Sequence, residues 1–128
     1  MRVYGPINSG SASGGAGVAT ASATTVIPIV GFVTAIAVRY NDSPPATTDV
    51  TVAGAGTNHV ALTLLTLTND NTNVVKNVRH AIHDNTGAVI TFDGTNEVYD
   101  MPALSDFVTV TIAQANDADS VDVWLFLI

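Results

Sequence analysis

The chain has 128 residues, of which 47% are hydrophobic and only 12% are charged, and its formal net charge is -7. The length suits a single domain, and because soluble domains carry about 25% charged residues, we expect partners to cover part of this surface. Binding to nucleic acid or to an anionic membrane requires clustered cations, and we expect neither. The Lys and Arg residues are instead scattered along the chain: Arg2, Arg39, Lys76 and Arg79. The lack of cysteine excludes disulfides and thiolate metal sites.

Residues 1–23 are dominated by Gly, Ser and Ala, which is the composition of a flexible arm. Ordering about 20 such residues costs on the order of 20–40 kcal/mol of backbone entropy. Val3, Tyr4 and Ile7 bring too little apolar area to offset that cost on a free surface. We therefore expect an extended N-terminal arm that contacts neighbouring subunits, with folding back onto its own domain as the alternative. Deletion of residues 1–20 is expected to leave a folded domain.

From residue 24 onward the hydrophobic pattern has a period of two, which predicts β-strands. In the longest strand, one face is expected to carry Phe32 together with Ile36 and Val38, and the other Val33 and Arg39. A change of phase near Leu65 indicates a β-bulge or a strand buried on both faces. The predicted strands span residues 32–40, 48–52, 60–67, 74–83, 88–92, 97–99, 107–112 and 121–128.

Turn residues separate these segments at roughly ten-residue intervals. Asp93-Gly94 is the pair that two-residue type I′ hairpins favour, because both central residues need positive φ. Short strands with such turns, and the abundance of Thr and Val, predict an all-β fold with very little helix. We expect residues 24–128 to form a single antiparallel β-sandwich or jelly-roll-like domain.

Candidate catalytic and metal-binding residues are few. His80 and His83 are three residues apart, which on a strand places them on opposite faces and prevents a shared metal. The acidic turns at residues 70–73 and 116–119 offer calcium-type oxygen ligands without a full calcium-loop spacing, and Asn and Asp are also ordinary turn residues. We find no nucleophile elbow, zinc motif, phosphate loop or dinucleotide fingerprint, and expect neither enzymatic activity nor a cofactor.

Several residues are candidates for an assembly interface rather than for chemistry. Arg39 and Arg79 lie within largely apolar strands, where they would form inter-subunit salt bridges or face water. The final apolar run, residues 124–128, is typical either of a subunit interface or of plain core. The full set of interface candidates is Val3, Tyr4, Ile7, Arg39, Arg79, Trp124 and Phe126.

The segment Gly31-Phe32-Val33 through Arg39-Tyr40-Asn41-Asp42-Ser43-Pro44-Pro45 to Val50-Thr51 resembles a family of small virion proteins of tailed bacteriophages and prophages. The resemblance continues through Arg79-His80, His83-Asp84-Asn85-Thr86-Gly87 and Asp93-Gly94-Thr95-Asn96-Glu97-Val98-Tyr99. It also includes Ile112-Ala113-Gln114-Ala115-Asn116 and Asp119-Ser120-Val121-Asp122-Val123-Trp124. It covers residues 31–128 and leaves out the arm. An aromatic often precedes the Arg-His pair in that family, whereas residues 74–78 here include none.

The resemblance implies a capsid-associated role and brings no catalytic residues with it. We expect a capsid decoration (cement) protein, made in the cytoplasm of the bacterial host and located on the head surface of the virion. Its expected partners are the major capsid protein and copies of itself in a homotrimer. A neck, tail or head-fibre component is one alternative. A carbohydrate-binding β-sandwich on the virion surface is another, and it would need exposed aromatic side chains.

Overall fold

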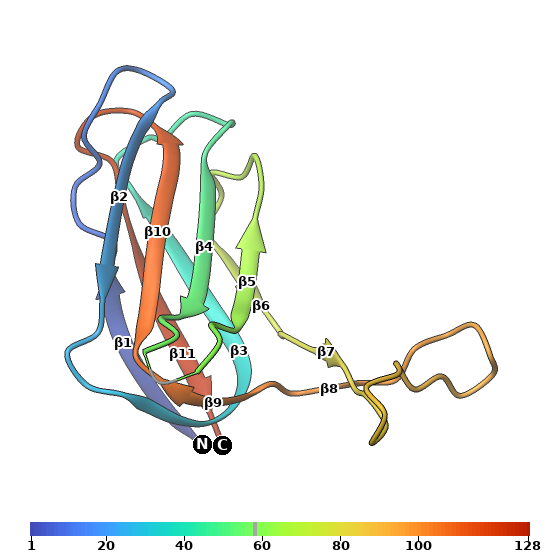
Figure 1. The fold of residues 1–128 in the computed structure, drawn as a ribbon. Helices are drawn as coiled ribbons and strands as arrows, with labels where there is room; N and C mark the ends of the chain where they lie inside the picture. Colours follow the sequence, from blue (N-terminus) through green and yellow to red (C-terminus); the bar gives the residue numbers. More distant parts are fainter. Residues whose placement is uncertain (58) are drawn as a thin grey trace.

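The computed structural model describes residues 1–57 and 59–128, and these residues form an all-β protein without helix. Most strands belong to two antiparallel sheets, and Figure 1 shows them as two layers, one behind the other. A third, two-stranded sheet lies apart from both layers. Within the described residues there is accordingly no apolar helix of membrane-spanning length.

The first sheet has the strand order β1-β11-β3-β6, and a further strand, β9, also pairs with β3. All of its pairings are antiparallel. β11, one of its two inner strands, corresponds to the apolar run predicted at the end of the sequence. The bounds are β1 Arg2–Asn8, β11 Ser120–Leu127, β3 Ile29–Asn41, β6 Val74–Lys76 and β9 Ala103–Asp106.

The second sheet has the order β2-β10-β4-β5 and is likewise antiparallel. In β10 the predicted alternation is confirmed: Val108 and Val110 are fully buried, while Thr109 and Thr111 are only half-buried. Val52 of β4 pairs with Leu65 of β5, and the next residue, Ala53, pairs with Thr63, so β5 has one extra residue at this point. The predicted change of phase is therefore a β-bulge. The bounds are β2 Ala19–Thr24, β10 Val108–Ala115, β4 Asp49–Gly54 and β5 Thr63–Leu67.

One hydrophobic core lies between the two sheets and draws on both. The first sheet contributes Val123 and Leu125 from β11 and Ile36 from β3, all with no exposed surface. The second sheet contributes Val52 and Ile112, which also have no exposed surface. Each fully buried Val, Leu or Ile side chain stabilises the fold by about 1.5–3 kcal/mol, so this layer of branched side chains holds the sheets together.

The structure does not confirm the expected extended arm. β1 pairs with β11 and β2 pairs with β10, so that residues 1–23 supply an edge strand to each of the chain's own sheets. Between these strands the backbone of Ser9 bonds to Val121 and that of Ala12 bonds to Asp119. The alternative, folding back onto the same domain, is what the structure shows. The open backbone groups of β10 and β11 provide hydrogen bonds that do not depend on side-chain composition.

The long strand predicted at residues 32–40 is confirmed as part of β3, but one end of it faces the other way. Ile36 and Val38 point into the core as expected, whereas Phe32 is 53% exposed and Val33 is fully buried. The register with β11 slips here, because Phe126 lies opposite Ala35 and Leu127 lies opposite Val33. This irregularity adds one residue to β3 and exchanges the two faces on either side of it.

The strand predicted at residues 74–83 is broken into two short pieces. β6 ends at Lys76, and β7, His80–Ala81, pairs with β8, Tyr99–Asp100, in the separate two-stranded sheet. The two-residue turn expected at Asp93-Gly94 is also wrong, because only Gly94 of the pair has a positive φ. The amide of Phe92 instead bonds the carbonyl of Asn96 across a longer turn.

The first prediction concerns the buried hydroxyl of Ser9, which accepts a hydrogen bond from the amide of Val121 at 3.1 Å. Replacing Ser9 by Ala leaves that amide without this buried acceptor, so the free energy of unfolding should fall by about 1–3 kcal/mol. Urea denaturation measures the change. The exposed Ser11→Ala is the control and should be neutral. Equal stability of the two variants would show that residues 1–23 contribute little to the folded domain.

Candidate functional site

The outer face of the first sheet, turned away from the core, is apolar. Four exposed apolar side chains lie on it, and their exposed fractions run from 53% to 63%. Half-buried aromatic side chains from β11 lie among them, and Val75 and Phe126 both line a hollow of about 150 Å³. Antiparallel sheets commonly present polar residues to water on this side, so the pattern indicates a covered surface. We call it the outer apolar face: Val3, Val30, Phe32, Val75, Trp124 and Phe126.

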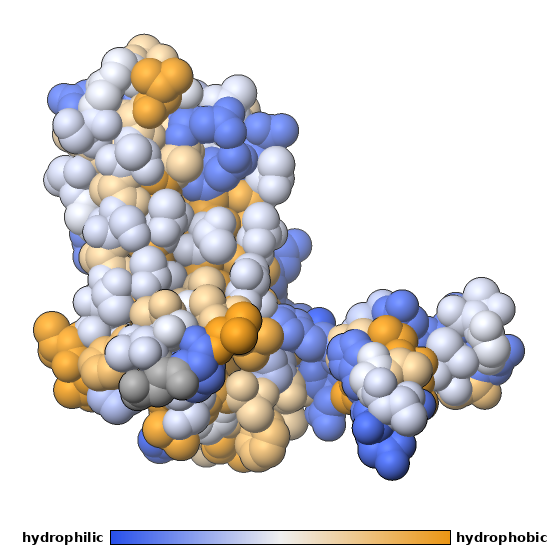
Figure 2. Space-filling view, viewed as in Figure 1, coloured by the Kyte–Doolittle hydropathy of each residue, from blue (hydrophilic) through white to orange (hydrophobic). Residues whose placement is uncertain are grey.

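The outer face of the second sheet provides a contrast within the same molecule. It carries small hydroxyl side chains, and these bond to one another between β2 and β10. Ser22 pairs with Thr111 at 3.1 Å, and Thr24 pairs with Thr109 at 2.8 Å. This sheet faces the viewer in Figure 2, where its surface is mostly pale rather than strongly apolar. Only one of the two sheets therefore presents large apolar side chains on its outer side.

A polar cluster borders the outer apolar face. The Arg39 guanidinium donates to the Asp122 carboxylate at 2.7 Å, and the Arg39 side chain lies over the ring of Trp124, 5.2 Å from its centre. Asn8 and Asn41 also donate to Asp122. Arg39 was a candidate for an inter-subunit salt bridge, and the structure instead pairs it within its own chain. The cluster fixes the orientation of Trp124 at this border.

The seven interface candidates do not all lie together. Val3, Trp124 and Phe126 belong to the outer apolar face, with Arg39 at its border. Tyr4 and Ile7 turn inward, because a slip in the pairing of β1 with β11 places Tyr4 opposite Leu125 and Ile7 opposite Val123. Ile7 is only 6% exposed and belongs to the core. Sequence reasoning missed Val30 and Val75, and it placed Phe32 on the wrong face because nothing marked the irregularity in β3.

A projecting lobe, residues 77–102, is the second unusual feature and was not expected from the sequence. In Figure 1 it extends sideways beyond the edge of β3, carrying β7 and β8. β6 and β9 pair with different parts of β3, and the lobe leaves the sheet in the gap between them. In this gap Arg79 donates to the carbonyl of Thr34 at 2.8 Å, and the carbonyl of Pro102 accepts from the amide of Val33. A guanidinium thus occupies the place of a missing backbone donor.

The lobe has a small core of its own. The backbones of Ile82, Ile90 and Val98 form a closed ring of hydrogen bonds, each residue donating to the next at 3.0 Å. Their side chains are half-buried. Asp84 and Asp93 close the two outer turns. The Asp84 carboxylate accepts hydrogen bonds from the hydroxyl and the amide of Thr86, the Asp93 carboxylate accepts from the amide of Asn96, and these bonds lower the pKa of both. The lobe therefore has a defined shape, although three apolar residues are too few to stabilise it alone.

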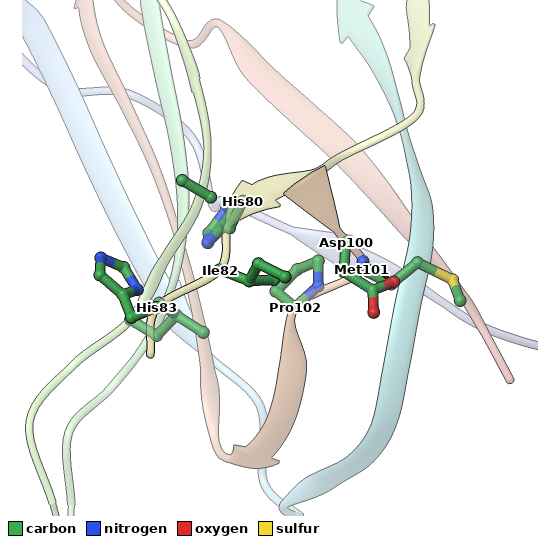
Figure 3. Close-up of a pocket in the computed structure, with 8 residues that line it drawn as sticks. His80, Ile82, His83, Asp100, Met101 and Pro102 are labelled. Carbon is green, nitrogen blue, oxygen red and sulfur yellow. Dashed lines mark hydrogen bonds between the residues drawn. The ribbon is translucent and has the colours of Figure 1, made fainter. Parts of the chain in front are cut away.

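A hollow of about 430 Å³ lies where the lobe joins the sheets. His80 and His83 both line it, and Figure 3 shows them on one side with Asp100 and Met101 across from them. The expectation that the two histidines occupy opposite faces of a strand is wrong, because β7 ends at Ala81. Among the described residues no group of three His, Cys, Asp or Glu side chains is arranged to hold a metal ion.

A polar hollow of about 410 Å³ lies between the β3–β4 and β5–β6 connections. Asp42, Asn71 and Asn73 line it, and Tyr40 lies at its inner side. Burial raises the pKa of Tyr40, so the hydroxyl is neutral; in the described part of the chain it has no hydrogen-bond partner. The neighbouring Asp70 is used within its own turn, where it accepts from the amide of Thr72.

The outer apolar face and the projecting lobe are thus the two surfaces that distinguish this chain. One is a sheet face of large apolar side chains, and the other is a small structured extension. In comparisons with known proteins, no family model, curated protein or solved structure matches the chain. Function is therefore inferred from these surfaces and from the resemblance of residues 31–128.

The second prediction concerns pH. Burial raises the pKa of Asp122, but hydrogen bonds from Asn8, Arg39 and Asn41 outweigh it and hold the pKa below the ordinary value of 3.8. A lowered pKa stabilises the fold above pH 3.8, and this contribution is lost as the pH falls through the lowered value. Asp122→Asn should reduce the free energy of unfolding by about 1–2 kcal/mol near pH 7.

The difference between Asp122→Asn and the unmodified chain should shrink as the pH falls from 3.8 to the lowered pKa of Asp122, because below that pKa the carboxyl is protonated in both the folded and the unfolded state. Urea denaturation across the acid range measures it. The exposed Asp117→Asn is the matched control. A difference that stays constant with pH would contradict the assigned role of the charge.

The third prediction concerns the root of the lobe. Arg79→Met removes the hydrogen bond to Thr34, which contributes about 1–1.5 kcal/mol. Amide hydrogen exchange should accelerate about tenfold in residues 80–101 and stay unchanged in β10 and β11, because the lobe opens without the sheets. Lys76→Met, which removes a cation from the same edge, is the control. Uniform acceleration throughout the chain would show that Arg79 supports the whole fold instead.

Proposed function

We propose that the chain is a structural protein of a bacteriophage virion, a capsid decoration protein that binds the outer surface of the head. The observation that carries the proposal is the outer apolar face. Exposed apolar area of this kind, on a chain with only 12% charged residues, is typical of a protein that functions within an assembly. The resemblance of residues 31–128 to small virion proteins supplies the identity of that assembly.

The pairing of the strands supports a jelly-roll β-sandwich as the body of this protein. The first and last strands pair, β1 with β11, and the second pairs with the next to last, β2 with β10. Further inward β3 pairs with β6 and β9, and β4 pairs with β5. This is the order produced when one long hairpin is rolled up, and jelly rolls are frequent in viral capsid proteins.

Decoration would stabilise the head by mass action. A protein that binds the mature lattice in preference to its precursor shifts the equilibrium toward the mature form. Several weak contacts per oligomer then add up to tight attachment, provided that they can engage together. The partners would be the major capsid protein and copies of the chain itself in a homotrimer. Because residues 1–23 belong to the sheets, these contacts would come from the outer apolar face and the lobe, and no separate arm takes part.

The fourth prediction tests attachment to the head. Purified chain added to heads that lack it should bind and raise their thermal stability, as measured by sedimentation and calorimetry. Phe32→Ser removes an exposed aromatic from the outer apolar face and should weaken binding by about tenfold or more. Val18→Ser removes an apolar side chain with comparable exposure outside that face and should bind normally.

The number of copies per virion distinguishes decoration from its main alternative. A decoration protein matches the number of capsomers, whereas a neck, tail or head-fibre component is present in few copies. Quantitative mass spectrometry of purified virions gives this number. Few copies, together with no binding to heads, would contradict the proposed role.

One observation favours a second function, carbohydrate binding. The polar hollow between the β3–β4 and β5–β6 connections presents Asp42, Asn71 and Asn73, whose side chains suit the hydroxyl groups of a sugar. The large aromatic that usually stacks on a sugar ring is missing from its lining, since Tyr40 is buried. Absence of binding on a glycan array would remove this alternative.

A further inference from the structure

The connection between β4 and β5, residues 55–62, reaches from the second sheet to β9 of the first sheet. In Figure 1 it lies at the end of the sandwich where β9 is found. The amide of Gly56 donates to the carboxylate of Asp106 at 2.7 Å, and Asp106 is only 4% exposed. The amide of Ala55 bonds the carbonyl of Phe107. The start of this connection is therefore held at the junction of β9 and β10.

His59 makes a second attachment to β9, through both nitrogens of its ring. Nδ1 lies 2.9 Å from the carbonyl oxygen of Val60, and Nε2 lies 3.1 Å from the carbonyl oxygen of Ser105 in β9. A carbonyl oxygen can only accept a hydrogen bond, whereas a neutral imidazole has a single N–H group. The neutral ring therefore donates to one of the two carbonyls and turns a nitrogen lone pair toward the other. The imidazolium has two N–H groups and donates to both.

We infer that His59 is a pH-dependent clasp, which holds the β4–β5 connection on β9 when the ring is protonated and releases it when the proton leaves. The protonated ring bridges Val60 in the connection to Ser105, and so joins the second sheet to the first at this end. Loss of the proton removes one hydrogen bond and leaves a nitrogen lone pair against a carbonyl oxygen. The ring then withdraws from one of its two partners, and the connection opens.

The charges around the ring favour the closed form. Asp106 faces it from β9, with 4.0 Å between the carboxylate and Nε2. The rest of the connection and of β9 contains no other titratable side chain, and neither do residues 29–32, which pair with β9, or residues 107–112. The His59 side chain is about half exposed, so its proton exchanges freely with water. The charged partner thus supports the imidazolium, and no cation in these segments opposes it.

The direction of the pH dependence follows from the same contacts. The hydrogen bonds to Val60 and Ser105, together with the nearby Asp106, outweigh burial and raise the pKa of His59 above 6.5. A raised pKa stabilises the fold fully below pH 6.5, and this contribution is lost as the pH rises through the raised value. Leu62, near the other end of the connection, lines the hollow at the root of the lobe, so opening the clasp loosens one wall of that hollow. The inference is independent of the proposed function.

The experiment is an NMR titration of the full chain, labelled with ¹⁵N, between pH 5 and pH 9. Both ring nitrogens of His59 should be protonated at pH 6.5, and the titration midpoint should lie above that value. Amide exchange of Gly56 reports the opening, because a Cβ atom added to Gly56 would lie 3.1 Å from the carbonyl oxygen of His59. Its protection, corrected for the intrinsic exchange rate, should fall by up to about tenfold as His59 loses its proton, since one pKa unit is a tenfold change in equilibrium.

Two variants separate the clasp from a general effect of pH. In His59→Gln the side chain does not titrate, so the protection of Gly56 should be low and equal at pH 6 and pH 8. His83→Gln removes another exposed histidine and should keep the pH dependence of the unmodified chain. The inference is overturned if His59 titrates at or below pH 6.5, if the protection of Gly56 does not follow that titration, or if His59→Gln keeps the pH dependence.

Discussion

The open edge of β3 is the constraint on which the rest of the structure depends. β3 has 13 residues, and its far edge is paired in two separate pieces, by β6 and β9. The amide of the fully buried Val33 in this gap would otherwise be left unsatisfied, at a cost comparable to a lost hydrogen bond. Arg79 and Pro102 fill the gap, one as a donor and the other as an acceptor. The backbone of β3 therefore keeps hydrogen-bond partners at the point where the lobe leaves its edge.

The first sheet is apolar on both sides, and the two sides have different roles. Inward, Val121, Val123 and Leu125 of β11 have no exposed surface and hold the second sheet. Outward, Trp124 and Phe126 alternate with them and remain half-buried. A strand that is apolar on both faces is expected in the middle of a layered structure. In this chain only one side is covered, which is why its outer side has the character of an interface.

Period-two patterning was enough to predict the all-β fold and most strands, because alternation reflects directly which side chains are buried. In β10 the alternation of Val and Thr left no ambiguity. The predicted faces of β3 were wrong at one end. One added residue exchanges the side chains that face the core with those that face outward, and nothing in the sequence marks such a residue. The pairing of residues 1–23 was also missed, since backbone hydrogen bonds to β10 and β11 depend on neighbours far away in sequence. The same holds for the outer apolar face, which draws on strands from both ends of the chain.

The strands that begin the chain also have a role in solubility. β1 covers one edge of β11 and β2 covers one edge of β10; β2 consists of Ala, Ser and Thr, and in β1 the apolar residues are interrupted by Gly5 and Pro6. Unpaired strand edges recruit other chains indiscriminately and lead to aggregation. With Gly5 and Pro6 interrupting β1, the outermost strand offers an irregular ladder to any further strand. At these two edges of the sandwich, contacts with other chains are thereby restricted to side chains, which can be specific and reversible.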